Sequence, residues 1–302
     1  MSAAEQLRLG AVTVVLGERG GRYPQGNSLF IEGSRETAVI DPSLRLLALG
    51  DGLPRVQRVL SSHCHEDHIA GNHLFPEASW HAHEHDVEGL RSLDAMMEIY
   101  GYEGPTGDDF RRVLVEDFHY RARPDARSFT DGAVFDLGDV RVRVLHTPGH
   151  TRGHSCFLVE GRGCEDGLLY LGDIDLTSFG PYYGDAASDL EDFERSIELV
   201  RGVHVRWYAT FHHIGVLEGR EAFERRLERF AGRIEERERR LLEFLAEPRT
   251  LDEIARHRFV YRPQDEVPWA EAVERRSMEQ HLERLERSGR VERLAGGRFR
   301  AR

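Results

Sequence analysis

The sequence predicts an α/β protein in which two β-sheets are covered by helices, with a small helical domain at the C-terminal end. Short β-branched and aromatic runs alternate with segments of helical periodicity over residues 1–230. Residues 231–302 are rich in Arg and Glu and mainly helical in pattern. A length of 302 residues suffices for one large domain and one small one. We therefore expect two domains, 1–230 and 231–302.

The strands of the larger domain are predicted from short runs of β-branched and aromatic residues. Between Val140 and Leu145, valines alternate with arginines, which is the period of a half-buried strand. The other predicted strands are Val12–Leu16, Ser28–Ile31, Ala38–Ile40, Val59–Leu60, Cys156–Val159, Leu168–Leu171 and Val203–Ala209. Several of these runs end directly before polar residues, at loops where scaffolds usually place functional groups.

The helices are predicted from capping residues and apolar spacing. Ser188 and Glu191 have the spacing of a capping box, and apolar residues then repeat at helical intervals up to Val200. A longer helix is predicted from Phe223 to Leu241. The segment from Trp80 to His85 is predicted as a strand that runs into a helix, and simple helix packing is favoured for 96–102 over a lid or a dimer contact.

The C-terminal domain is predicted to resemble a winged helix, because helices are followed by a terminal β-hairpin. Thr250 and Glu253 form a second capping box, and a helix with Trp269 and Leu285 on its apolar face ends near Gly289. The hairpin comprises Val291–Leu294 and 298–300 around two glycines. From residue 234 onward, 16 arginines face 15 acidic residues, so packing or homodimerisation is favoured over DNA binding.

Composition excludes several classes of protein. The net charge is −12, and every basic residue is arginine, which excludes lysine chemistry and disfavours nucleic-acid binding. No apolar run approaches the roughly 20 residues that span a bilayer, and no secretory pattern opens the sequence. Cys64, Cys156 and Cys164 form no CxxC pair or disulfide framework. We therefore expect a cytoplasmic protein without a membrane partner.

The stretch from Ser62 to His68 carries the chemistry. It places His63, His65, Asp67 and His68 within six positions, directly after an apolar strand. In an extended segment His63 and His65 point the same way and can share one ion, whereas Asp67 and His68 fall where a helix begins and aim elsewhere. One loop can therefore supply ligands to two adjacent ions. Imidazole and carboxylate ligands without thiolates suit Zn²⁺, Fe²⁺ or Mn²⁺.

Later strand ends supply further ligand-type residues. His150 follows one predicted strand in the sequence TPGH, and Asp173 follows another in LGD. His212 and His213 both follow Val203–Ala209. This order of motifs, HxHxDH, TPGHTxGH, GD and a late histidine, resembles the metallo-β-lactamase superfamily over about residues 10–215, and within it the glyoxalase-II-like hydrolases.

The resemblance implies an αβ/βα sandwich with a two-metal site, and some members of the family carry a C-terminal winged helix. It assigns His63, His65 and His150 to one metal, and Asp67, His68 and His212 to the other, with Asp173 as the bridge. Alignment with the usual Gly-His-Gly favours His212 over His213 as the last ligand. His213 would then face the substrate or support a ligand. We expect two divalent ions, with Zn²⁺ favoured over Fe²⁺ and Mn²⁺.

This ligand set predicts a metal-dependent hydrolase for a small-molecule ester, thioester or lactone. A water that bridges two cations loses its proton near neutral pH and can attack a carbonyl. Asp67 is the catalytic candidate, since a metal-binding carboxylate there can also move a proton. Alternatives within the same family are a mononuclear-iron persulfide dioxygenase and an RNA-cleaving or phosphodiester-cleaving nuclease. A non-catalytic binding module is a further alternative, which the complete ligand set disfavours.

Other residues receive weaker assignments. Tyr182 and Tyr183 follow the bridging aspartate and are candidates for substrate binding, with His213. His154 is expected to orient a ligand rather than bind the metal. The alternating histidines at 81, 83 and 85 are expected to form no second metal site, and Cys64 is expected not to act as a nucleophile.

Overall fold

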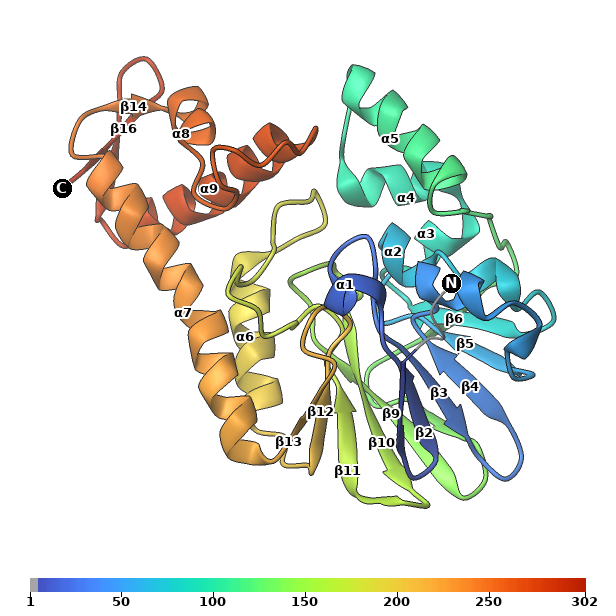
Figure 1. Ribbon diagram of the computed structural model, residues 1–302. Coiled ribbons are helices and arrows are strands. Elements are labelled where there is room, and N and C mark those ends of the chain that lie inside the picture. Colours follow the sequence, from blue (N-terminus) through green and yellow to red (C-terminus); the bar gives the residue numbers. More distant parts are fainter. Residues whose placement is uncertain (1–4) are drawn as a thin grey trace.

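Two β-sheets form the centre of the molecule in the computed structural model, which describes residues 5–302 (Figure 1). The strands of the first sheet lie in sequence order: β1 (Gln6–Leu9), β2 (Val12–Val15), β3 (Ser28–Glu32), β4 (Thr37–Ile40), β5 (Arg58–Leu60), β6 (Ser79–His83) and β7 (Arg127–Phe129). The second sheet has the order β13 (Val216–Glu218), β12 (Trp207–Ala209), β11 (Cys164–Tyr170), β10 (Ser155–Gly161), β9 (Val140–His146) and β8 (Val134–Asp136).

Helices cover the outer face of each sheet. The first sheet is covered by α3 (Val87–Arg91), α4 (Leu93–Tyr100) and α5 (Gly104–Glu116), and the second by α6 (Leu190–Arg201) and the first part of α7 (Arg220–Phe244). Shorter helices lie in the loops: α1 (Glu18–Gly21), η1 (Leu44–Gly52), α2 (Glu66–Ile69) and η2 (Asn72–Leu74). The α/β fold with two covered sheets is confirmed.

Both faces of each sheet are buried, and successive side chains of a strand contribute to opposite faces. In β3, Leu29 and Ile31 face the core between the sheets, whereas Phe30 packs under the helices of the first sheet. In β11, Leu168 faces the core between the sheets, and Leu169 packs under α6 and α7. Since successive strand residues point to opposite faces, near-continuous apolar runs are needed here. No helix within residues 5–302 combines the length and the apolar character needed to cross a bilayer.

The C-terminal part is joined to the sandwich by α7, which continues without interruption across the expected domain boundary at residues 230 and 231 (Figure 1). Phe230 packs with the second sheet, whereas Leu241 belongs to a separate C-terminal core. That core also contains α8 (Leu251–His257), α9 (Ala270–Arg287) and a small sheet in which β16 (Arg298–Ala301) pairs with both β14 (Arg249–Thr250) and β15 (Val291–Leu294).

Local predictions differ in outcome. The capping box at Thr250 and Glu253 is confirmed, with both of its hydrogen bonds present. The capping box at Ser188 and Glu191 is wrong: Asp189 caps α6, and its side chain accepts a hydrogen bond from the backbone of Asp192 at 2.7 Å. The Ser188 hydroxyl donates instead to the carbonyl of His150 at 2.7 Å. The strand predicted over Val203–Ala209 is shorter, because only Trp207–Ala209 pair with β11.

Candidate metal centre

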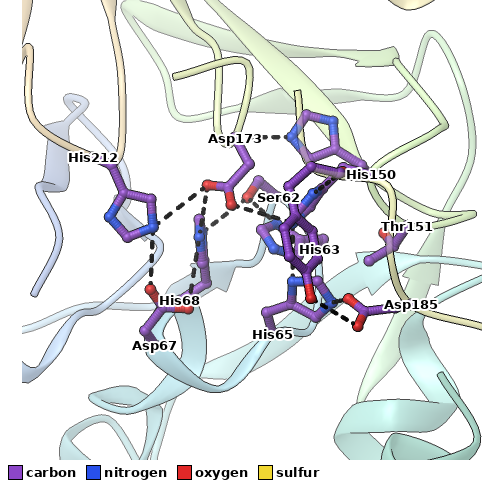
Figure 2. A network of polar contacts seen from close by, with 12 residues as sticks. Ser62, His63, His65, Asp67, His68, His150, Thr151, Asp173, Asp185 and His212 are labelled. Atoms are coloured by element: carbon purple, nitrogen blue, oxygen red, sulfur yellow. Dashed lines mark hydrogen bonds and ion pairs between the residues drawn. The ribbon is translucent and has the colours of Figure 1, made fainter. Parts of the chain in front are cut away.

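The ligand-type side chains meet at one end of the sandwich, in loops that follow four strands (Figure 2). His63 and His65 lie between β5 and α2, and Asp67 and His68 lie within α2. His150, Asp173 and His212 follow β9, β11 and β12, respectively. All seven side chains are wholly or mostly buried; among the six that are below a tenth exposed, the range is 0% for His63 to 9% for His212.

Their donor atoms form three groups in which every atom lies within 4.8 Å of the others. One group is His63, His65 and His150; the second is Asp67, His68 and His212; the third joins His63, His68 and Asp173. Asp173 lies between the first two groups, because one carboxylate oxygen is 3.1 Å from His150 Nε2 and the other is 2.9 Å from His68 Nε2. This arrangement brings together all seven residues that the motifs single out.

Several of these donor atoms are buried without a properly directed hydrogen bond, namely His63 Nε2, His68 Nε2, Asp67 Oδ2 and Asp173 Oδ1; where one of them has a close polar neighbour, that neighbour is another donor atom of the cluster. Burying a polar atom without a partner is costly, so such a cluster needs something that binds lone pairs. Imidazole nitrogens and carboxylate oxygens at this spacing fit divalent cations. The residues present therefore fit a metal centre.

The protonation of the site agrees with this interpretation. Burial, followed by the neighbouring imidazoles, holds the pKa of His63 well below its usual value, so the ring is neutral as a ligand must be. Burial alone would raise the pKa of Asp173, but His68, His150 and His212 outweigh it and hold that pKa well below its usual range. Against burial, Asp173 and Asp67 raise the pKa of His212 to about 9. The carboxylates of Asp67 and Asp173 therefore favour positive charge at their neighbours, and a bound cation would supply that charge.

Each imidazole is also held on its second ring nitrogen, which fixes the ring orientation. These contacts are Ser62 Oγ on His63 Nδ1 at 3.1 Å, Asp185 on His65 Nε2 at 3.2 Å, the Tyr182 carbonyl on His150 Nδ1 at 3.0 Å, and the Gly21 carbonyl on His212 Nδ1 at 3.0 Å. The ligand nitrogens are thereby aimed at the same space.

Asp41 holds the fifth imidazole and is a residue that sequence reasoning missed. It follows β4, is fully buried, and has a φ of 45°, an uncommon conformation for a residue other than glycine. Its carboxylate lies 2.8 Å from His68 Nδ1 and accepts hydrogen bonds from the Ser62 backbone N–H and the Tyr170 hydroxyl, both at 2.7 Å. Asp41 therefore holds both the loop that carries His63 and the imidazole of His68.

His154 contacts the backbone of Asp173 and belongs to none of the three donor groups. Its Nε2 accepts a hydrogen bond from the backbone N–H of Asp173 at 3.1 Å. Gly172 has a φ of 52°, and a Cβ at this position would lie only 2.6 Å from that nitrogen. Only glycine allows this approach, which explains the residue that precedes Asp173.

A pocket of about 310 Å³ opens over the metal centre. Five of the seven ligand-type residues line one side of it, namely His65, Asp67, His150, Asp173 and His212; we call all seven together the metal wall. Aromatic side chains line the remainder, including Tyr100, Tyr102 and Phe110 from α4, α5 and the segment between them. Tyr261, Val267 and Trp269, from the segment between α8 and α9, close the pocket; we call them the C-terminal wall.

The two predicted tyrosines lie on opposite sides of their segment. Tyr182 lines the pocket, and its hydroxyl donates to Asp185 at 3.1 Å. Tyr183 does not line it: this side chain is 1% exposed, and its hydroxyl contacts His281 Nε2 at 2.9 Å and Arg237 at 3.1 Å. The expectation that Tyr183 binds substrate is therefore corrected, because neighbouring residues in an extended segment point in opposite directions.

His213 lines the pocket but belongs to none of the three donor groups. The histidines at 81, 83 and 85 also belong to no such group among residues 5–302; His83 instead stacks on His146 at 3.9 Å between ring centroids. Cys64 is fully buried and does not line the pocket, and burial raises the pKa of its thiol well above the usual value. A buried thiol of this kind is not a nucleophile.

Sequence comparisons identify relatives of the catalytic part. The family model for the metallo-beta-lactamase superfamily matches residues 21–213. The chain is 29% identical over 210 residues to the acyl-coenzyme A thioesterase MBLAC2 of Gallus gallus, covering 59% of this chain and 70% of that protein. It is 26% identical over 161 residues to an atrochrysone carboxyl ACP thioesterase of Aspergillus terreus, covering 53% of this chain. The match covers 42% of that fungal protein, so the chain spans less than half of its length.

Solved structures match nearly the whole chain. A metallo-beta-lactamase family protein from Thermus thermophilus is similar with a TM-score of 0.69 and 26% identity, covering 97% of this chain and 99% of that one. A beta-lactamase domain protein from Burkholderia ambifaria has a TM-score of 0.70 at 17% identity and covers 100% of this chain. The second likeness concerns the fold alone.

Proposed function

The chain belongs to the metallo-beta-lactamase superfamily, and from that premise we propose that it is a binuclear metal-dependent hydrolase of thioesters. The observation that carries the proposal is Asp173, which lies between two groups of buried ligands beside an aromatic pocket. The names of the relatives support a thioester as substrate, since both the acyl-coenzyme A and the ACP enzymes are thioesterases. An aromatic pocket of about 310 Å³ suits an acyl chain.

Two divalent ions, with Zn²⁺ favoured, would be held by the seven ligands. His63, His65 and His150 would hold one, Asp67, His68 and His212 the other, and Asp173 would contact both. When bound, such ions activate water at neutral pH and polarise the carbonyl oxygen of a substrate. We retain His212 rather than His213 as the last ligand, because His212 Nε2 is 3.2 Å from Asp67.

Asp67 is the residue that we propose to move the proton. It lines the pocket, and one of its carboxylate oxygens is buried 3.2 Å from His212 Nε2. Burial would raise the pKa of Asp67, but His68 and His212 outweigh it and hold that pKa below its usual value, so the carboxylate is ionised at neutral pH. An ionised carboxylate in this position can take the proton of the attacking water and return it to the leaving thiolate.

The other pocket residues orient the substrate and exclude water. Tyr182 lines the pocket, and its backbone carbonyl holds the ring of His150 at Nδ1. Tyr100, Phe110 and Trp269 supply apolar surface for an acyl group. Water exclusion strengthens the electrostatic interactions made during the reaction.

Metal analysis of the purified protein together with a thioester panel tests the proposal. We expect two divalent ions per chain, and hydrolysis of acyl thioesters that chelation abolishes and added metal restores. A single iron per chain with sulfur oxidation in place of hydrolysis would contradict it and favour a persulfide dioxygenase. Hydrolysis of RNA or of phosphodiesters alone would also contradict it.

A further inference from the structure

A second hollow, which we call the basic groove, continues from the pocket between α7 and the segment that leads to α9. Its volume is about 900 Å³, against about 310 Å³ for the pocket. Both hollows share lining residues: Arg22, Thr177, Phe179, His213, Tyr261 and Val267. A ligand that reaches the metal wall through the pocket can therefore extend into the basic groove.

The basic groove is strongly positive although the chain as a whole has a net charge of −12. Seven arginines line it, against only two carboxylates, Glu236 and Asp265. Glu236 pairs with Arg233. Within residues 5–302 the other arginines have no carboxylate within 4.0 Å: Arg22, Arg226, Arg229, Arg237, Arg240 and Arg262. Within the described residues, none of these six charges is therefore neutralised by a direct ion pair.

This lack of pairing is confined to one side of α7. On the same helix, Arg225 pairs with Glu221, and Arg239 pairs with Glu243 at 2.6 Å. Pairs four residues apart are the usual way in which a charged helix neutralises itself. Arg226 is the neighbour of Arg225, yet it faces the groove and has no acidic partner among the residues described. The positive charge is thus concentrated where a ligand would enter.

Part of the cationic surface is held rigidly. Arg237 is 3% exposed and donates to the carbonyl of Phe179 at 2.7 Å, and Arg240 donates to the carbonyl of Phe259 at 3.2 Å. Carbonyls fix these guanidinium groups without cancelling their charge. Guanidinium forks match phosphate oxygens in geometry, and a hollow lined by several of them suits a ligand that carries phosphates.

We propose that the basic groove binds the phosphates of a nucleotide-bearing thiol of the coenzyme A type while the thioester lies at the metal wall. This inference rests on the proposed thioesterase function and names the carrier side of its substrate. An acidic carrier protein is the competing occupant. It would need a broad face of roughly 800 Å², whereas these arginines line a hollow between two elements.

Binding is measured first, because it does not depend on turnover. Coenzyme A and adenosine 3′,5′-bisphosphate are titrated calorimetrically into the metal-loaded protein at low and high salt. We expect both to bind, with affinity that falls as salt rises. The double variant Arg226→Gln, Arg262→Gln should weaken binding by about tenfold or more, since charge-assisted hydrogen bonds are lost. The matched control Arg225→Gln, Arg239→Gln removes the same charge from positions that do not line the groove and should leave binding unchanged.

Hydrolysis separates this inference from the proposed function. The ratio of kcat/KM for an acyl-coenzyme A to that for the same acyl-pantetheine should fall about tenfold in the groove variant and stay constant in the control. An equal loss of kcat/KM with both thioesters, or unchanged nucleotide binding in the groove variant, would overturn the assignment of the groove and leave the proposed thioesterase function intact. Binding of the nucleotide without hydrolysis of any thioester would support the groove and remove the proposed function. If the groove variant lost kcat/KM only with the thioester of an acidic carrier protein, the groove would be a binding site for that protein and not for a nucleotide.

Discussion

The pocket has two walls that are built in different ways. The metal wall comes from loops at the ends of strands, and each imidazole in it is fixed on its second nitrogen by a contact of 3.2 Å or less. The C-terminal wall comes from the segment between α8 and α9 (Figure 1). That segment is held by Glu274, a fully buried carboxylate that accepts hydrogen bonds from the backbone N–H groups of residues 259–261 at 2.7–2.9 Å.

The two walls also differ in what connects them to the sandwich. Arg276 on α9 donates to the carbonyl of Tyr100 at 2.8 Å, and Gln280 donates to the carbonyl of Tyr183 at 2.9 Å. These contacts attach the C-terminal part to the backbone of segments that line or adjoin the pocket. Under the proposed function, the reaction would depend on the metal wall and the fit of the substrate on the C-terminal wall, so substitutions should separate the two.

The strongest test of this division is Asp173→Ala, which removes the carboxylate between the two ligand groups. Metal content and hydrolysis should fall together, with kcat/KM reduced by about a thousandfold, since a lost metal contact costs several kcal/mol in the transition state. Metal analysis and thioester kinetics on the same sample measure both. Full activity with both metals retained would contradict the bridging role.

A smaller effect on the same wall is expected for Asp41→Asn. The amide keeps the shape of the side chain but not the charge that faces His68 Nδ1 at 2.8 Å. Substituting a group that orients a ligand lowers metal affinity or activity by about 10- to 100-fold. Metal affinity is measured by competition with a chelator, and excess metal should restore much of the rate. An unchanged metal affinity would show that Asp41 holds Ser62 and Tyr170 in place but does not orient His68.

The metal wall could be predicted from the sequence to a greater extent than the C-terminal wall. Four of the seven metal-wall residues lie within six consecutive positions, and the others follow strands whose apolar runs are visible, so motif and strand end together indicate the site. The role of Asp41 could not be predicted, because it is a single acidic residue after a strand and its partner Tyr170 lies 129 positions away. Only the fold brings such pairs together.

The C-terminal wall could not be predicted, although its elements could. The capping box at Thr250 and the terminal hairpin are local features and are confirmed. Contact of Arg276 with Tyr100 spans 176 positions and depends on how α9 packs, which no local pattern encodes. The expectation for Tyr183 was wrong for a related reason: composition indicates an aromatic pair, but only the backbone direction decides which ring faces the pocket.

Trp269→Ala addresses the C-terminal wall directly. Its ring lies 5.2 Å from that of Phe110 and 6.2 Å from that of Tyr102, measured between centroids, so it completes an aromatic lining. Loss of this surface should raise KM for a long-chain acyl thioester by about tenfold, the equivalent of 1–2 kcal/mol of apolar contact. Metal content and the rate with an acetyl thioester should stay as in the wild type. A fall in metal content would show that the two walls are coupled.

The smallest effect is expected for Glu238→Gln on α7, which acts on the attachment of the C-terminal part. Contact with His281, followed by the Arg284 guanidinium, lowers the pKa of Glu238 from 4.5 to about 2. Arg290 donates to the same carboxylate at 2.6 Å. Because the folded pKa lies below the unfolded one, the ionised carboxylate stabilises the fold above about pH 4.5, and this contribution is lost as the pH falls toward 2.

Glu238→Gln should therefore lower the free energy of unfolding at pH 7 by about 1 kcal/mol, the scale of a partly exposed charged hydrogen bond. The difference from the wild type should shrink as the pH is lowered from 4.5 to 2. Urea unfolding at several pH values measures this difference in free energy. The control is Arg239→Gln, which removes an exposed arginine that pairs with Glu243 on the same helix. A constant difference at all pH values would mean that packing rather than charge attaches α9 to α7. Metal content should not change in either variant, because neither residue touches the metal wall.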